Sequence, residues 1–184
     1  MVEKSVRSGA EDDFVEGNEP LERPLAAGRA RILKRWDMAE FSVADAALVD
    51  LPPSLLYELL ALRVDVFVVE QACPYRELDG RDLESSARLV WATRGETVVA
   101  TLRVLDEGSG VIRIGRVATA LEARGVGIGA LIVRRAIALA GGRPVVLAAQ
   151  AHLAEWYGQF GFIRDGDDYL EDGIPHTPMR LSAV

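Results

Sequence analysis

One stretch of the sequence restricts the fold more than any other: EARGVGIGALIV, residues Glu122–Val133, in which glycines alternate with aliphatic residues directly after Arg124. Small residues let backbone N–H groups approach a ligand closely, and a helix that follows them adds the partial positive charge of its N-terminus. Arg124 adds a full positive charge. The stretch therefore predicts a strand–loop–helix unit that binds a phosphate or pyrophosphate. A tight turn without a ligand would leave two of the three glycines unexplained.

The segments around this loop predict an α/β fold of the α+β kind. Three runs rich in β-branched residues are joined by Gly-containing turn signals, so they predict an antiparallel meander: residues 87–93, 96–106 and 110–119. The chain after the loop predicts a helix that ends at two glycines, then a buried strand, a second helix and two closing strands: residues 128–140, 143–150, 151–160, 161–166 and 176–182.

The first third of the chain has a different character. Residues 1–30 are rich in charged residues, Gly and Pro, and their isolated apolar residues follow no period. We therefore predict a flexible N-terminal arm, followed by a single domain at 31–184. The alternative is an arm that docks through its few apolar side chains. The remaining pattern predicts a strand, a helix and a long loop with a helical turn: residues 35–43, 50–67 and 67–86.

The composition excludes several classes of function. A net charge of -7 argues against a surface that binds nucleic acid or an anionic membrane, since both need clustered Lys and Arg. Cys73 is the single cysteine and the two histidines have no zinc-ligand spacing, so we expect no metal. No stretch reaches the roughly 20 apolar residues that span a bilayer. We therefore expect a cytoplasmic protein.

The glycine loop also fits a dinucleotide-binding pattern, because GVGIGA matches G-x-G-x-x-A. That pattern requires an acidic residue about 20 positions further on, at the end of the next strand. Gln150 stands there instead, and too few residues follow it for the remaining parallel strands. The signature of a P-loop nucleotidase is absent from the sequence as well. Both of these nucleotide-binding folds are therefore rejected.

The arrangement instead resembles the GNAT superfamily of N-acyltransferases, whose pyrophosphate loop reads Arg or Gln, two residues, Gly, one residue, and Gly or Ala. Arg124, Gly127 and Gly129 match this motif. Four blocks in the same order resemble the ElaA-like branch: LRVDVFVVEQACPYRELDGRDL, IGRVAT, AQAHLAEWYGQFGF and EDGIPHTPM. They cover most of residues 55–181. The resemblance implies the GNAT fold, a mixed, mostly antiparallel sheet flanked by helices.

The resemblance also implies a reaction, the transfer of an acetyl group from acetyl-CoA to a primary amine by direct attack in a ternary complex. The pyrophosphate would bind the loop: Arg124, Gly125, Val126, Gly127, Ile128 and Gly129. The pantetheine arm would pair like an extra strand with three residues before it: Val117, Ala118 and Thr119. Tyr157 matches the position that protonates the CoA sulfur. Gln150 stands where many members have an Asn that contacts the cofactor.

The residues that would bind and deprotonate the acceptor amine have fewer signals in the sequence. An amine with a pKa near about 10 must lose a proton before it attacks, and Glu70 is the first candidate for the base. A helix cap or a surface group is the alternative for Glu70. Five further residues are predicted to line or order the acceptor pocket: Arg63, Gln71, Asp79, His152 and His176.

Two other functions remain open at this stage. The first is a non-catalytic regulatory module that binds acyl-CoA through the same loop. The second, acyl-homoserine lactone synthesis, would need a basic surface for an acyl carrier protein. The expected partner of the favoured enzyme is an amine acceptor, either a small molecule or a protein, and the sequence leaves room for a homodimer.

Overall fold

The structure is a computed structural model that describes residues 40–183. The predicted arm at 1–30 and the start of the predicted first strand lie outside these residues. The helices and strands are β1 (Phe41–Ala46), α1 (Pro53–Val64), β2 (Arg88–Arg94), β3 (Thr97–Asp106), β4 (Ile112–Thr119), α2 (Ile128–Ala140), β5 (Val145–Gln150), α3 (Ala154–Gly158), β6 (Ile163–Arg164), β7 (Tyr169–Glu171) and β8 (Ile174–Leu181).

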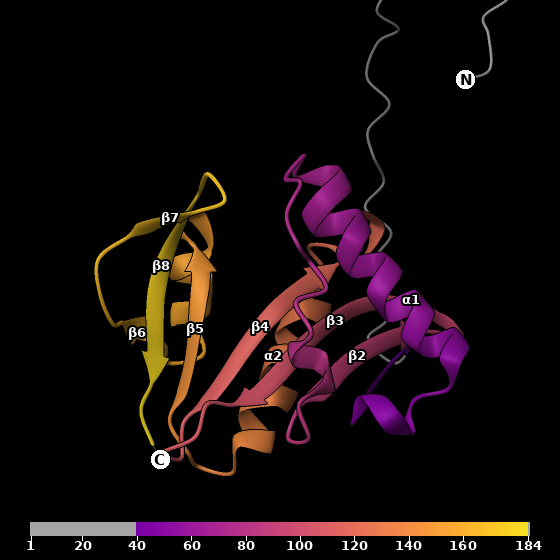
Figure 1. The fold of residues 1–184 in the computed structure, drawn as a ribbon, viewed down its shortest axis with the longest axis horizontal. Coiled ribbons are helices and arrows are strands. Elements are labelled where there is room, and N and C mark those ends of the chain that lie inside the picture. The colour runs from indigo at the N-terminus through magenta and orange to yellow at the C-terminus, as the bar shows by residue number, and fades with distance from the viewer. Residues whose placement is uncertain (1–39, 184) are drawn as a thin grey trace, which may run out of the picture. The chain divides into compact units, whose positions relative to one another are not determined.

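The strands form one sheet in the order β1-β2-β3-β4-β5-β8-β6, with β7 paired to β8. The pairing of β4 with β5 is parallel and the others are antiparallel. This parallel pair holds at only two positions, Ile112 with Val145 and Arg113 with Val146. Beyond them the two strands diverge (Figure 1). The sheet is therefore split, and within residues 40–183 no strand neighbours the inner edges of β4 and β5 there.

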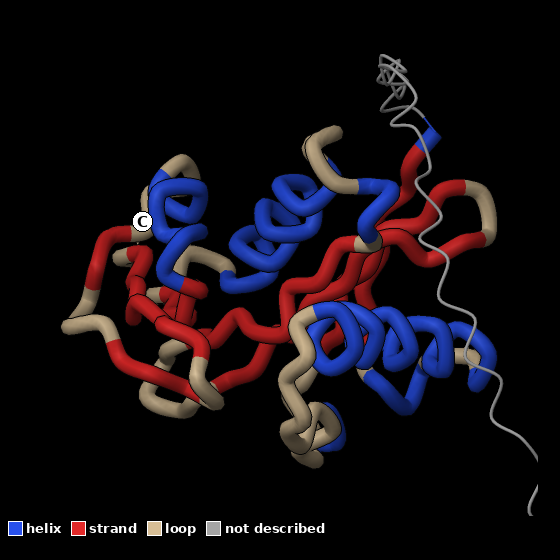
Figure 2. Tube along the Cα trace, turned by 90° about the horizontal axis from the view of Figure 1, so that it is seen from above, coloured by secondary structure: helices blue, strands red, loops and turns tan. Residues whose placement is uncertain are grey.

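Helices cover both faces of the sheet. α1 lies on one face and α2 on the other, as Figures 1 and 2 show from two directions. β3 is central, and every residue from Val98 to Leu105 is buried. A strand covered on both faces has apolar residues at successive positions instead of alternating ones, and VVATLRVL follows this rule except at Thr101 and Arg103.

One face of α2 packs into the main hydrophobic core. Its buried residues recur at the spacing of a single helix face: Ile128, Ile132, Val133, Ala136 and Ala140. They join buried side chains of the sheet, which include Val90, Leu102, Ile114, Val145 and Leu147. α2 begins after Gly127 (φ 89°) and ends before Gly141 (φ 61°), and glycine adopts these left-handed conformations without steric cost.

The structure confirms the predicted meander, the α2 helix and the strand that follows it. The predicted helix at 50–67 is α1, which begins with Pro53 at its first position and continues as a π-helix at Asp65–Glu70. The predicted helix at 151–160 is shorter, because Ala151–Leu153 forms a 3-10 turn before α3. The sequence missed β7, a strand of three exposed residues with no alternating pattern. Among residues 40–183, no helix is both long and apolar enough to cross a membrane.

A buried cluster of charges ties α1 to the loop that follows it. Arg63 of α1 is 1% exposed, and its guanidinium donates to Glu77 at 2.7 Å and to Asp82 at 2.8 Å. Asp82 in turn lies 3.3 Å from Arg103 of β3. Removing these charges from water is costly, and the hydrogen bonds between them offset that cost. The cluster fixes the loop against α1 and β3.

Replacing Arg63 tests this role. Arg63→Ala leaves the carboxylates of Glu77 and Asp82 buried with one fewer cation, so we expect the free energy of unfolding to fall by about 3–5 kcal/mol. Urea unfolding followed by circular dichroism measures the loss. The matched control is Arg164→Ala, which removes an exposed pair with Asp168 and should cost at most about 1 kcal/mol. Equal losses in the two variants would contradict the role of the cluster.

Candidate active site

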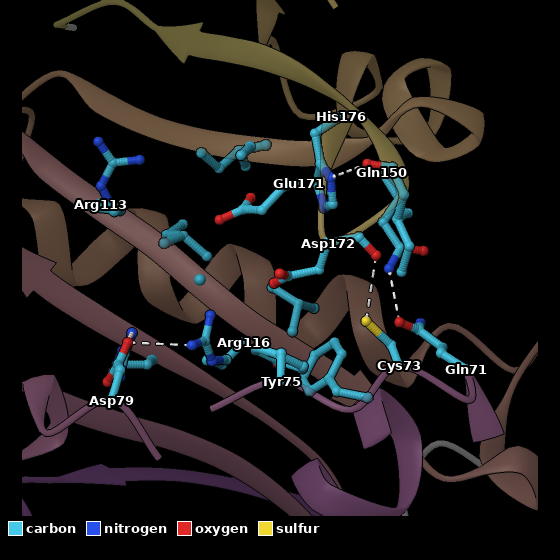
Figure 3. Close-up of a pocket in the computed structure, with 18 of the residues that line it drawn as sticks. Gln71, Cys73, Tyr75, Asp79, Arg113, Arg116, Gln150, Glu171, Asp172 and His176 are labelled. Carbon is cyan, nitrogen blue, oxygen red and sulfur yellow. Dashed lines mark hydrogen bonds and ion pairs between the residues drawn. The ribbon is translucent and has the colours of Figure 1, made fainter. Parts of the chain in front are cut away.

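A cavity of about 740 Å³ lies where β4 and β5 separate. Its walls come from β4, β5, the loop between α1 and β2, and the hairpin of β7 and β8. Figure 3 shows side chains of the hairpin facing those of the loop: Glu171, Asp172 and His176 opposite Gln71, Cys73 and Tyr75. The split in the sheet therefore brings together segments that are far apart in the sequence.

The glycine loop lies between the end of β4 and the start of α2. Gly125 and Gly127 have φ values of 77° and 89°, which residues with a Cβ rarely adopt. No side chain caps the N-terminus of α2, and among the described residues the N–H groups of 125–127 donate no hydrogen bond. Free N–H donors at a helix N-terminus favour an anion. The predicted loop residues thus lie together at an uncapped helix N-terminus.

The part of β4 before this loop has an irregular conformation. The register between β3 and β4 shifts around Arg116, whose φ of 55° is unusual for a residue with a side chain. Its guanidinium lies 3.2 Å from Asp79 and holds this bulge against the loop. The predicted cofactor residues Val117, Ala118 and Thr119 follow Arg116, and the last two of them pair with β3 on one edge. The other edge is open toward the split.

Tyr157 lines the cavity from α3 and is 5% exposed. Its ring packs edge-on against Trp156 and Phe162, at centroid distances of 4.8 and 6.0 Å. Burial raises the pKa of Tyr157 well above the usual value for a phenol. Within residues 40–183 its hydroxyl has no hydrogen-bond partner. The structure thus presents a protonated phenol to the cavity.

Glu70, the predicted base, does not line this cavity. Its two carboxylate oxygens accept hydrogen bonds of 2.7 Å from the guanidinium of Arg124. Arg124 also donates from Nε to the backbone oxygen of Thr119 at 2.9 Å. The hydrogen bond from Arg124 lowers the pKa of Glu70, and a carboxylate with a lowered pKa is a weaker base. The role of Glu70 stays a prediction that this ion pair does not favour.

Three of the predicted acceptor residues line the cavity together with Gln150: Gln71, Asp79 and His176. Gln150 at the end of β5 donates from Nε2 to Oε1 of Gln71 at 3.1 Å. This bond joins the loop to the far side of the split. His176 lies directly opposite Gln150 in the pairing of β5 with β8. Its side chain therefore shares a face of the sheet with that amide.

The carboxylate of Asp79 is fully engaged by arginines. Two hydrogen bonds of 2.7 and 2.8 Å come from Arg103, and Arg116 lies 3.2 Å away. Partial burial raises the pKa of Asp79, but the hydrogen bonds from Arg103 and from the backbone N–H of Arg81 lower it by more, so the net pKa is far below the usual range. Asp79 therefore stays charged and orders the wall of the cavity.

Two predicted acceptor residues lie elsewhere. Arg63 is buried beneath the loop with Glu77 and Asp82, so it supports the cavity wall without reaching the cavity. His152 is exposed in the 3-10 turn at Ala151–Leu153 and is not among the residues that line the cavity. These positions do not favour contact of either residue with an acceptor.

Sequence reasoning missed several residues that line the cavity: Tyr75, Arg76, Arg113, Tyr169, Glu171 and Asp172. The sulfur of Cys73 donates to the backbone oxygen of Asp172 at 3.6 Å and joins the loop to the hairpin. The one sequence signal for these residues is the Asp-Gly turn after Glu171, which predicts a hairpin but not what it faces. Among the described residues, no group of three or more His, Cys, Asp or Glu side chains could hold a metal ion.

The burial of Tyr157 predicts how stability changes with pH. Because the pKa of Tyr157 is raised in the folded state, its contribution is complete below the unfolded pKa and is lost as the pH rises above it. We expect that above about pH 10 the wild type loses about 1.4 kcal/mol per pH unit more than Tyr157→Phe. Urea unfolding at several alkaline pH values measures the difference. Tyr57→Phe, at a side chain that is 76% exposed, is the control. Parallel pH dependences of wild type and Tyr157→Phe would contradict the prediction.

Comparison with known proteins connects this geometry to a family. A family model described as an acetyltransferase (GNAT) domain matches residues 57–183. The UPF0039 protein Rv2851c of Mycobacterium tuberculosis is 52% identical over 134 residues, which is 71% of this chain and 86% of that protein. The ElaA protein of Escherichia coli is 40% identical over 141 residues, which is 73% of this chain and 92% of ElaA.

Solved structures agree with these relatives. An acyl-CoA N-acyltransferase from Pseudomonas aeruginosa matches with a TM-score of 0.72 at 43% identity, over 76% of this chain and 98% of its own. The crystal structure of Escherichia coli ElaA matches with a TM-score of 0.72 at 37% identity, over the same shares of the two chains. The fold, the glycine loop and these similarities agree, and the chain belongs to the GNAT family of acyltransferases as a homologue of ElaA.

Proposed function

We propose that this acyltransferase is an N-acetyltransferase that transfers an acetyl group from acetyl-CoA to a primary amine by direct attack in a ternary complex. One observation supports the proposal: a single cavity in the split sheet is lined by the buried phenol of Tyr157 and by Val117 of β4, the strand that leads through the glycine loop to the uncapped start of α2. A donor that has a diphosphate, an amide-containing arm and a thioester meets a complementary group at each of these places.

The residues present fit such a donor. The unbonded N–H groups of 125–127 would bind the diphosphate at the N-terminus of α2. The open edge of β4 at 117–119 would hydrogen-bond the amides of the pantetheine arm, as in strand addition. A backbone N–H of the same residues would hold the oxyanion of the tetrahedral intermediate. Acetyl-CoA, when bound, supplies the activated acetyl group.

Tyr157 is proposed as the acid that protonates the departing thiolate. Its raised pKa keeps the phenol protonated at neutral pH, so the proton is present when the carbon–sulfur bond breaks. Its hydroxyl is free to turn to the sulfur, because it donates no hydrogen bond within the described residues. The aromatic contacts with Trp156 and Phe162 hold the ring in place.

The decisive experiment is a screen of amines with acetyl-CoA, in which free thiol release reports turnover. The panel contains an alkylamine, a diamine, an aminoglycoside and a peptide with a free N-terminus. We expect Tyr157→Phe to lower turnover by about 10²- to 10⁴-fold and to keep most of the affinity for CoA, because the loss of a general acid acts on the chemical step. Calorimetry measures that affinity.

Tyr57→Phe is the matched control, since Tyr57 is exposed on α1 and lies away from the cavity. Unchanged turnover in Tyr157→Phe would remove Tyr157 from its role. Tight binding of CoA without transfer to any amine of the panel would instead favour a non-catalytic module that binds acyl-CoA. The absence of any CoA binding would overturn both readings.

The ion pair of Glu70 with Arg124 predicts an effect on CoA affinity. The diphosphate must compete with Glu70 for the guanidinium, so Glu70→Gln should make CoA bind more tightly. An exposed pair of this kind contributes about 0–1 kcal/mol, which corresponds to at most about a fivefold change in the dissociation constant. Turnover should stay close to that of the wild type. Calorimetry with CoA and the thiol-release assay provide the two readouts.

Glu122→Gln is the control for this experiment. Glu122 also lies near Arg124 and affects it electrostatically, but it makes no hydrogen bond to it among the described residues. Glu122→Gln should therefore change CoA affinity less than Glu70→Gln does. A large loss of turnover in Glu70→Gln, with CoA affinity unchanged, would restore Glu70 as the base.

The compartment and the partners of the proposed enzyme are inferred from the sequence. We propose a cytoplasmic enzyme whose acceptor is a small molecule or a protein with a free amine, and which has no nucleic-acid or membrane partner. The net charge of -7 supports the last point. A homodimer is compatible with these features.

A further inference from the structure

The proposed transfer needs a base inside the cavity, because a primary amine is mostly protonated at neutral pH and cannot attack in that form. Among the charged side chains considered so far, Glu70 lies outside the cavity and is paired with Arg124. Asp79 lines the cavity, but Arg103 and Arg116 occupy its oxygens. Neither carboxylate is placed to accept a proton from an amine.

His176 meets the geometric requirements. It lies on β8 with Gln150 opposite it on β5 and Tyr169 opposite it on β7, so its side chain shares one face with both. All three side chains line the cavity. The imidazole is half-buried and packs beside the ring of Tyr169 at a centroid distance of 6.0 Å. Figure 3 shows His176 in the wall of the cavity, near Glu171.

The hydrogen bond of His176 fixes which ring nitrogen can act. Nδ1 lies 2.9 Å from the backbone oxygen of Ile174, and a carbonyl oxygen can only accept. Nδ1 therefore carries the hydrogen, and the neutral ring has its lone pair on Nε2. Nε2 has no hydrogen-bond partner among the described residues. The ring thus has an unbonded nitrogen, and its side chain lines the cavity.

We propose that Nε2 of His176 is the general base of the acetyl transfer, an inference that rests on the proposed function. One proton moves from the ammonium group of the acceptor to Nε2, and the amine nitrogen then forms its bond to the acetyl carbon. The carbon–sulfur bond breaks, and the thiolate takes the proton of the Tyr157 phenol. The second proton of the amine nitrogen restores that phenol through solvent, and His176 releases its proton to bulk water.

The surroundings of His176 suit a positive charge after proton transfer. The carbonyl of Ile174 keeps its hydrogen bond to Nδ1 in the imidazolium form. Glu171 and Asp172, in the hairpin that carries His176, add two carboxylates that line the same cavity. No arginine donates a hydrogen bond to either carboxylate among the described residues. A cationic acceptor and the imidazolium would both gain from these negative charges.

Nuclear magnetic resonance of the full chain tests the tautomer without any substrate. The chain has two histidines, so long-range correlations between ring nitrogens and carbons in ¹⁵N-labelled protein are readily assigned with His176→Gln. We expect neutral His176 to carry its hydrogen on Nδ1, the less common tautomer in solution. A hydrogen on Nε2 in the neutral ring would overturn the proposal, because Nε2 would then have no lone pair with which to accept a proton.

Kinetics of His176→Gln provide the second readout. With the panel amine that the wild type acetylates fastest, we expect kcat to fall by about 10²- to 10⁴-fold and CoA affinity to change less than about twofold. Glu171→Gln and Asp172→Asn, the competing carboxylates, should each lower kcat by less than about tenfold. A small effect of His176→Gln, or a larger effect of either carboxylate variant, would overturn the assignment.

The two readouts separate this inference from the proposed function. If the wild type acetylates an amine and His176→Gln does so equally well, the base assignment fails and the acetyltransferase remains. If the wild type binds CoA but transfers to no amine, the proposed function fails and the base assignment falls with it. In the second case the histidine spectra still report whether the bond to Ile174 sets the tautomer.

Discussion

Beyond Arg113 no strand in the described part of the chain neighbours the inner edges of β4 and β5, and this open pair of edges is the constraint on which the rest of the structure depends. Backbone N–H and C=O groups need partners, so an open edge inside a domain is either wet or reserved for a ligand. Here the space between the edges is a cavity of about 740 Å³. A continuous sheet would have left no room for this cavity beside Tyr157.

The loop between α1 and β2 is held in place by charge, because it has little regular structure of its own. Arg63, Glu77 and Asp82 form its buried anchor, and Arg103 connects the anchor to Asp79 at the cavity wall. A buried ion pair is not in itself evidence of high stability, since desolvation cancels much of the attraction. Its directional hydrogen bonds do set the position of a loop that apolar contacts alone would leave less defined.

The hydrogen-bond partners and the burial of each side chain decide which role it can take in proton transfer. Glu70 faces Arg124 and has a lowered pKa, which favours a role in the competition for the cofactor diphosphate over proton transfer. His176 is bound through Nδ1 to a carbonyl and has a free Nε2. Tyr157 is buried among aromatic rings and has a raised pKa. The proposed base and the proposed acid thus line the same cavity, one with a free ring nitrogen and the other with a buried phenol.

The sequence by itself determined the local parts of this protein: the meander, the glycine loop before α2 and the helix α1. Each has a signal within a few residues, such as the spacing of apolar side chains or a glycine that the backbone requires. Only the tertiary structure decided which of the predicted site residues meet. Glu70 and Arg124 are 54 positions apart, and Gln71 and Gln150 are 79 apart. Contacts over such separations depend on the strand order and on the split between β4 and β5, and no local pattern in the sequence records either of them.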